Sequence, residues 1–258
     1  MKPWKGDSRQ IVRKSPEQLA LMRRGGMLLR EVFHLLESRL RPGVRDTDLD
    51  RIARETMQKM GAKPAFLGYR GFPASVCISI NEEVVHGVPR GRVLKEGDIV
   101  GIDIGLVYKE FITDASTTYA VGAVSPAAQR LMDVTREALF LGIDQMRPGH
   151  RVGDISAAIQ QHAEENGYSV VRDYTGHGIG RTMHEAPECP NFVTRGGGRG
   201  KRLEPGVVIA IEPMVNAGGS ETRLLKDNWT VVTADGSLSA HYEHTVAVTE
   251  DGPYILTL

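Results

Sequence analysis

The chain has 258 residues, of which 41% are hydrophobic and 25% are charged, and its 32 Lys and Arg balance 32 Asp and Glu. A formal net charge of zero argues against a binder that uses bulk positive charge to hold nucleic acids or membranes, so no specific nucleic-acid partner is expected. The composition is that of an average globular protein, long enough to bury a substantial core.

Cysteine content and the N-terminal sequence indicate where such a protein works. Cys77 and Cys189 are too few for a disulfide scaffold or a four-thiolate zinc site, so we expect a reducing compartment. Residues 1–7 lack the apolar stretch of a signal peptide, and no apolar run approaches the roughly 18 residues that cross a bilayer. We therefore predict a soluble cytoplasmic protein without membrane contact, and a monomer is the default oligomeric state.

Two helices are predicted at the start of the chain. Ser15 can cap the first of them, Pro16 suits its first turn, and Gln18 completes a capping box. A second amphipathic segment covers residues 50–60 and stops at Gly61, which is typical of a helix C-terminus.

A β-hairpin follows. Residues 99–106 and 111–120 are predicted as strands around a tight turn at 108–109. With that loop, Asp103 lies directly opposite Asp114, and opposed residues of an antiparallel pair have β-carbons only about 4.5–5.5 Å apart. Two alternatives stay open: a register that differs by a residue, or one acid that is exposed.

The second half of the chain repeats motifs of the first at offsets of 106 to 110 residues. Both copies of a Ser-Pro helix start, an Arg-Pro-Gly turn, an amphipathic segment ending in glycine, a histidine motif and a strand ending in an acid occur in compatible order. The matched segments are 15–16 with 125–126, 41–45 with 147–151, 50–61 with 156–167, 85–89 with 183–187, and 94–103 with 203–212.

This duplication predicts an α+β fold with pseudo-two-fold symmetry, in which a curved, mostly antiparallel sheet is backed by helices. The two halves span about 12–120 and 121–250 within a single catalytic domain, 1–258, because no linker separates them. The functional site is expected between the halves.

Four acids of this pattern suggest a metal site. Glu212 interrupts a run of apolar residues, where an unpaired carboxylate carries a large desolvation penalty, and Glu243 adjoins another predicted strand. If both converge with Asp103 and Asp114, two divalent ions would balance the four charges. His177, flanked by glycines, could add a nitrogen ligand, and such a donor set suits manganese, iron, cobalt or zinc.

From Ser15 to Val248 the chain resembles the type I methionine aminopeptidases, and it shows their motifs Ile211-Glu212-Pro213-Met214 and Tyr242-Glu243-His244-Thr245. The resemblance implies the pita-bread fold and two divalent ions per chain. It also implies a ligand set that consists of Asp103, Asp114, His177, Glu212 and Glu243.

The same resemblance implies removal of the initiator methionine from nascent polypeptides, through attack by a hydroxide that bridges the two ions. Glu212 then shuttles the proton, His184 hydrogen-bonds the developing oxyanion, and His86 contacts the scissile amide. The methionine pocket falls on Tyr69, Phe72, Cys77 and Trp229. Phe72 and Trp229 could instead be core residues, and Cys77 could be an inert buried thiol.

Some features depart from the family pattern or leave alternatives open. Phe72 replaces a common tyrosine and Arg70 a common histidine, which puts a pocket hydrogen bond and the entrance charge in doubt. The basic, glycine-rich loop 194–202 lacks the pattern of a phosphate-binding loop; a surface loop suffices, although its charge could touch the ribosome. His241 and His244 could orient Glu243 or simply belong to a strand.

Three other functions compete with this prediction. Prolidases and proline-specific aminopeptidases share the five ligands but carry an additional N-terminal domain, for which the roughly 14 residues before the first helix leave no room. Type II methionine aminopeptidases have a long insertion where only residues 185–211 separate His184 from Glu212 here. A non-catalytic binding protein on this fold would be expected to lose ligands that this chain retains.

Overall fold

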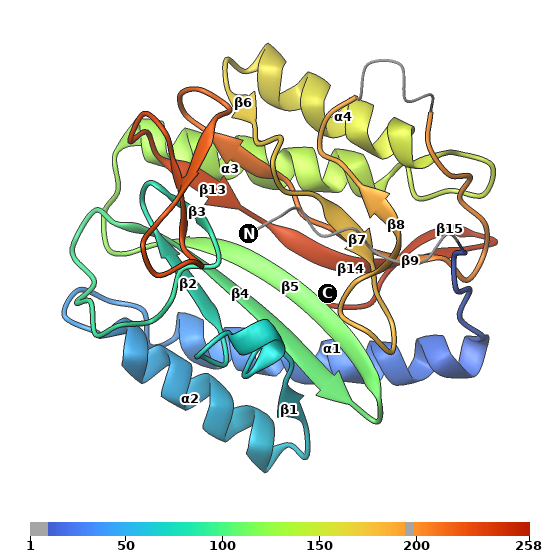
Figure 1. The fold of residues 1–258 in the computed structure, drawn as a ribbon, viewed down its shortest axis with the longest axis horizontal. Coiled ribbons are helices and arrows are strands. Elements are labelled where there is room, and N and C mark those ends of the chain that lie inside the picture. The colour runs from blue at the N-terminus through green and yellow to red at the C-terminus, as the bar shows by residue number, and fades with distance from the viewer. Residues whose placement is uncertain (1–9, 194–198) are drawn as a thin grey trace.

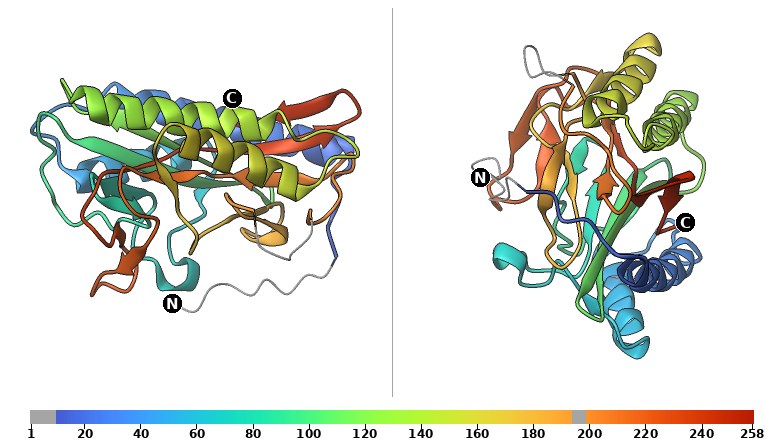
Figure 2. Two further views of the ribbon diagram at one scale, coloured as in Figure 1. Left: turned by 90° about the horizontal axis from the view of Figure 1, so that it is seen from above. Right: turned by 90° about the vertical axis from the view of Figure 1, so that its right-hand side faces the viewer.

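The computed structural model describes residues 10–193 and 199–258. Within them, four α-helices lie on one face of a large curved sheet (Figures 1 and 2). They are α1 (Pro16–Glu37), α2 (Asp46–Lys59), α3 (Pro126–Ile143) and α4 (Val152–Glu165), and a single 3-10 turn, η1, covers Tyr69–Gly71. The α+β architecture predicted from the sequence is confirmed.

Nine strands of the described residues form the main sheet, in the order β1-β4-β5-β14-β9-β7-β8, with β2 paired to β4 and β15 to β14. Two smaller sheets have the orders β13-β10-β6 and β11-β12-β3. The strands are β1 (Lys63–Pro64), β2 (Cys77–Ile80), β3 (Glu83–Val85), β4 (Ile99–Tyr108), β5 (Phe111–Ala120), β6 (Ser169–Val170), β7 (Gly176–Gly178), β8 (Glu185–Cys189), β9 (Val208–Ile211), β10 (Met214–Asn216), β11 (Thr222–Leu224), β12 (Val231–Thr233), β13 (Ser239–His241), β14 (Glu243–Thr249) and β15 (Gly252–Ile255).

The duplicated sequence segments form equivalent helices. The bounds of α2 and α4 differ by the 106 residues of the repeat, and Gly61 and Gly167 follow them with φ of 71° and 82°. Both helices begin four residues before the predicted segments. Asp46 is the reason in α2, because its buried carboxylate accepts the backbone N–H of Gly91 at 2.7 Å and fixes the first turn against a loop.

The predicted helix caps are present. Ser15 accepts the N–H of Gln18, whose side chain returns a hydrogen bond to the backbone of Ser15, and Ser125 accepts the N–H of Ala128. The two helix pairs bury separate apolar clusters against the sheet, α1 and α2 against the first half and α3 and α4 against the second. The helices thus hold one face of the sheet rigid and leave the opposite face for the site.

The hairpin register differs from the prediction by two residues. The turn lies at Lys109 and Glu110, both with positive φ, so Asp103 pairs with Ser116 and Asp114 pairs with Gly105. The prediction that the two acids are directly opposed is therefore wrong. A shift of two keeps both on the same face, because side chains alternate between faces with a period of two.

The described part of the chain contains no helix that is both long and apolar enough to span a membrane.

Candidate metal and peptide-binding site

Two adjacent rows of side chains cross the uncovered face of the sheet. In the first row, Asp103 on β4 pairs with Ser116 on β5, and Ser116 pairs with Glu243 on β14. Cys77 on β2 extends this row on the other side of Asp103. Two carboxylates therefore flank a small serine, which leaves room between them.

The second row holds an acid and an imidazole. Asp114 on β5 pairs with Gly105, and its N–H donates to the hydroxyl of Thr245 on β14 at 2.9 Å. Thr245 pairs with Ala210 on β9, which pairs with His177 on β7. Acid and imidazole thus again alternate with small residues, and the gap between them is open.

Glu212 completes the set from the end of β9. Its Oε1 lies 3.5 Å from His177 Nε2, and its backbone carbonyl accepts the side-chain N–H of Asn191 at 3.0 Å. His177 Nδ1 lies 3.0 Å from the carbonyl oxygen of Gly178, which only accepts, so Nδ1 carries the proton. The lone pair of His177 Nε2 therefore faces the acids, as metal ligation requires.

Burial makes this cluster unfavourable without a cation. It raises the pKa of Asp114 to about 7, and burial together with neighbouring carboxylates holds the pKa values of Asp103 and Glu243 well above their ordinary range. The pKa of Glu212 is also raised well above its usual value, by burial and then by the charge of Asp114. Four acids that repel one another need protons or cations.

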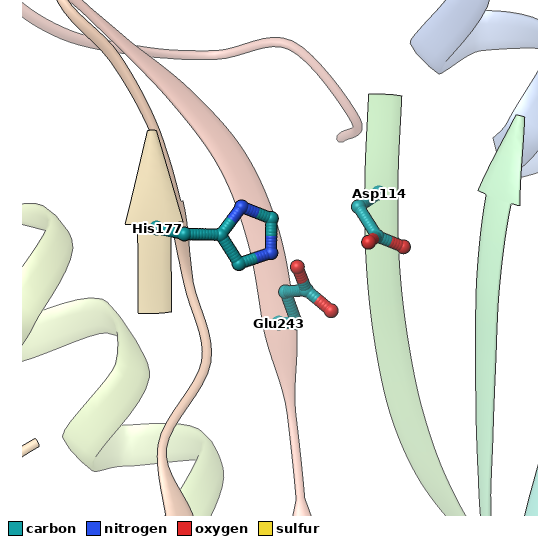
Figure 3. Close-up of side chains that lie close together, drawn as sticks. All are labelled: Asp114, His177 and Glu243. Atoms are coloured by element: carbon teal, nitrogen blue, oxygen red, sulfur yellow. The ribbon is translucent and has the colours of Figure 1, made fainter. Parts of the chain in front are cut away.

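The donor atoms fit a divalent metal. Asp103 Oδ1, Asp114 Oδ1 and Glu243 Oε1 are buried and have no hydrogen-bond partner among the described residues. One atom each from Asp114, His177 and Glu243 lie within 4.8 Å of one another, and Figure 3 shows these three side chains pointing toward a common point. Carboxylate oxygens with one imidazole suit a divalent transition metal.

Two further histidines reach the same cavity. His184 lies in the loop before β8, and its Nδ1 is 2.9 Å from the hydroxyl of Tyr69, while its ring centroid is 4.2 Å from that of His177. His86 follows β3 with a left-handed φ of 58° and faces the ring of Tyr174 edge-on. Burial lowers the pKa of His86 to about 4 and that of His184 to about 2, so both are neutral at neutral pH.

A cavity of about 590 Å³ joins all of these groups to an apolar pocket. Phe72 and Cys77 are 4% exposed, and the Phe72 ring meets Trp229 edge-on at a centroid distance of 5.1 Å. Tyr69 stacks on His184 at 5.7 Å. The four residues predicted for the methionine pocket therefore line one cavity together with the five predicted ligands.

Two pocket residues were not predicted. Phe66 packs edge-on against Phe72 at 6.4 Å, and Met183 also lines the cavity. The nearest sequence signals were the aromatic spacing from Phe66 to Phe72 and the position of Met183 beside His184. Arg70, at the rim, is exposed and adopts a left-handed φ of 51°.

The structure separates the two histidines that flank Glu243. His241 faces the cavity, with its Nε2 3.7 Å from Glu212 Oε2, whereas His244 bonds the hydroxyl of Thr257 and meets the ring of Phe140 on α3. Within the loop 194–202, residues 194–198 lie outside the described part of the chain. Arg199 of that loop pairs with Asp154 on α4 at 2.6 Å.

Comparison with known proteins agrees with this geometry. The model of metallopeptidase family M24 matches residues 20–250. The chain belongs to metallopeptidase family M24. It is 52% identical, over 96% of its length and 99% of the relative's, to a protein from Clostridium perfringens named methionine aminopeptidase, so the resemblance inferred from the sequence is confirmed.

Solved M24 structures agree on the fold. This M24 metallopeptidase superposes on the methionine aminopeptidase of Rickettsia prowazekii with a TM-score of 0.94 and 43% identity, covering 96% of this chain and all of that one. An Xaa-Pro dipeptidase from Bacillus anthracis is more distant, with a TM-score of 0.76 and 23% identity, and the match covers 95% of this chain and 61% of that one. The second likeness concerns the fold alone.

Proposed function

We propose that this M24 metallopeptidase removes the N-terminal initiator methionine from nascent polypeptides. The observation that supports this best is the continuity of one cavity from five clustered donor residues to an apolar pocket lined by aromatic and sulfur-containing side chains. The identity to proteins named methionine aminopeptidase also supports it.

The donor set would hold two divalent ions, drawn from manganese, iron, cobalt or zinc. Two ions match the four negative charges contributed by the carboxylates, and His177 Nε2 offers its lone pair from the side. The residues assigned to the ions are Asp103, Asp114, His177, Glu212 and Glu243. Bound ions of this class polarise a carbonyl group and lower the pKa of water.

Three side chains are assigned to the reaction. Glu212 is 14% exposed and faces the cavity, so its carboxylate can take a proton from the attacking water and return it to the leaving amine. His184 and His86 are neutral at neutral pH and can donate a ring N–H: His184 to the oxygen that gains charge, and His86 to the scissile amide.

The apolar pocket would select the methionine side chain. Phe72 and Trp229 form two of its walls, and Cys77, beside Asp103 in the sheet, lies close to the donor set. A flexible thioether makes favourable contacts with aromatic rings. This placement lets the substrate's side chain enter the pocket while its free amine and first peptide bond remain near the acids.

Nascent polypeptide N-termini, met in the cytoplasm by a monomeric enzyme, are the proposed substrates. Contact with the ribosome through loop 194–202 remains a hypothesis that rests on the basic residues of that loop.

Release of free methionine tests the proposal. A chelator-treated protein should release none from a Met-Gly-Pro peptide, and added manganese or cobalt should restore release, while an Xaa-Pro peptide without methionine should stay intact. Asp103→Asn should lower kcat/KM by more than about 100-fold, because it removes a charged donor at constant size. Metal content per chain is measured in parallel.

Asp173→Asn is the matched control, since Asp173 lines the same cavity outside the donor set and bonds only a neighbouring strand through Thr222. It should keep activity within about threefold, as surface changes usually cost little. Cleavage of the Xaa-Pro peptide alone, or full turnover by Asp103→Asn, would contradict the assignment.

A further inference from the structure

The residues before α1 lie against the second half of the molecule (Figure 1). In this segment, residues 10–15, the N–H of Lys14 donates to the carbonyl of Gly206 at 2.7 Å, and Arg13 Nε donates to the carbonyl of Pro205 at 2.7 Å. A β-carbon on Gly206 would lie only 2.7 Å from the Lys14 carbonyl oxygen. The segment is therefore packed directly on the turn that precedes β9.

The Lys14 side chain continues from there into a buried ion pair. Its Nζ donates to Glu185 Oε2 at 2.5 Å and to the carbonyl of Val12 at 2.9 Å, and the two charged side chains are 2% and 11% exposed. A β-carbon on Gly180 would lie 2.5 to 2.8 Å from this pair. The ion pair thus rests against the loop that joins β7 to β8.

The other oxygen of Glu185 fixes that loop from inside. Glu185 Oε1 accepts the backbone N–H of Arg181 at 2.9 Å and of Thr182 at 3.4 Å. The hydroxyl of Thr182 in turn donates to the carbonyl of His184 at 3.2 Å. One carboxylate therefore connects Lys14 to the turn that carries His184.

We propose that Lys14 is a positioning residue for His184. Without its ammonium group, the Glu185 carboxylate would be an almost buried charge that has lost its cation, and rotation toward water would release the N–H groups of Arg181 and Thr182. His184 would then lose its fixed place beside the reacting carbonyl. This inference rests on the proposed function, in which His184 acts on the developing oxyanion.

Kinetics of Lys14→Met test the inference, with Arg13→Met as the matched control. Arg13 is the neighbouring cation of the same segment, and it pairs with Glu204 in an exposed position. In the manganese-loaded enzyme, Lys14→Met should lower kcat for methionine release by about tenfold or more, with KM and manganese affinity within about twofold of the wild type. Arg13→Met should match the wild type in all three.

Hydrogen exchange supplies a readout that does not depend on activity. The amides of Arg181 and Thr182 should exchange faster in Lys14→Met, while those of β9 and β14 should not. If Lys14→Met is insoluble, Glu185→Gln provides the same measurements, because its amide oxygen can still accept both N–H groups while the charge is gone.

The outcomes separate the two hypotheses. If the wild type releases no methionine, the proposed function fails whatever the variants do. If the wild type is active and Lys14→Met keeps its kcat and its exchange pattern, only the positioning role fails. Parallel losses of manganese affinity, KM and kcat would likewise overturn it, since they would indicate a general structural role.

Discussion

Hydrogen bonds around the two adjacent imidazoles determine which ring atoms face the cavity. A carbonyl oxygen holds Nδ1 of His177 as a donor and leaves its Nε2 for the acids. At His184 the partner of Nδ1 is a hydroxyl, which can donate, so Nε2 of that ring can carry the proton. Neighbouring imidazoles are thus suited to opposite tasks, one to donate a lone pair and one to donate a proton.

Tyr69→Phe should therefore lower kcat of methionine release about three- to tenfold, because it removes one neutral hydrogen bond that selects the His184 tautomer. KM should change little, since the ring still stacks on His184 and lines the pocket. Steady-state kinetics on a Met-Gly-Pro peptide measure both. Tyr254→Phe, which removes an exposed hydroxyl outside the cavity, should behave as the wild type, and an unchanged kcat in Tyr69→Phe would refute the tautomer argument.

The residues that carry charge were predictable from the sequence, whereas the apolar ones were only partly so. Glu212 stands out because a carboxylate inside an apolar strand requires an explanation. Phe66 and Met183 do not stand out, because a pocket-lining aromatic or thioether has the same sequence pattern as a core residue. His241 also stayed ambiguous, since only the fold determines which side of a strand it occupies.

Strand β4 shows how one element can shape both the donor set and the pocket. Its Gly105 pairs with Asp114, and a β-carbon there would lie 2.6 Å from Phe66 Cε1 and 2.9 Å from Met183 Cε. Two residues along the same face, Gly101 has only ordinary contacts, the nearest at 3.6 Å. The strand therefore requires glycine at one of these positions and tolerates a side chain at the other.

Gly105→Ala should push Phe66 and Met183 into the pocket, raise KM for a methionine peptide several-fold and lower the free energy of unfolding by about 1–3 kcal/mol. Gly101→Ala is the matched control and should leave both quantities close to those of the wild type. Peptide kinetics and urea unfolding provide the measurements. Equal effects of the two variants would show that the added methyl group acts on the strand rather than on the pocket.

The sequence predicted the existence of this hairpin but not its register. Lys109 and Glu110 form the turn with φ of 43° and 72°, and this residue pair lacks the Asn-Gly signal that usually marks such turns. Helix starts were missed for a similar reason. Asp46 enters α2 through bonds to a loop far along the chain, which no local pattern reveals.

At the scale of the whole molecule, the donor set joins the two copies of the repeat. Asp103 and Asp114 come from the first half, and His177, Glu212 and Glu243 from the second, with the β5–β14 pairing between them. The duplication made this predictable, because each copy ends a strand in a carboxylate. The cost of gathering four acids is then a property of the folded chain as a whole.

Without bound ions, the free energy of unfolding should fall as the pH rises from about 7 to about 8. Asp114, with its pKa raised to about 7, and the other three buried carboxyls retain protons in the folded chain that the unfolded chain has released, so stability is lost as the pH rises through their folded pKa values. In this range the buried histidines are neutral in both states, and the thiols remain largely protonated. Urea unfolding of chelator-treated protein at both pH values measures the slope.

Asp114→Asn provides the control for this slope, since it removes the carboxyl that titrates within the range, and its stability should vary less with pH. Excess manganese should reverse the trend in the wild type, because cation binding requires deprotonated donors. A metal-free protein that gains stability between these pH values would show that the four acids are not buried together.

The pairing of β5 with β14 has a consequence for fragments of this chain. Each copy of the repeat contributes its own helix pair and apolar cluster, yet neither holds more than part of the five donors. A truncated half that folded would remain catalytically silent, and mixing both halves would restore chemistry only where the central seam re-formed. The seam between duplicated ancestral units, rather than either unit, is then the heritable element that selection on catalysis must preserve.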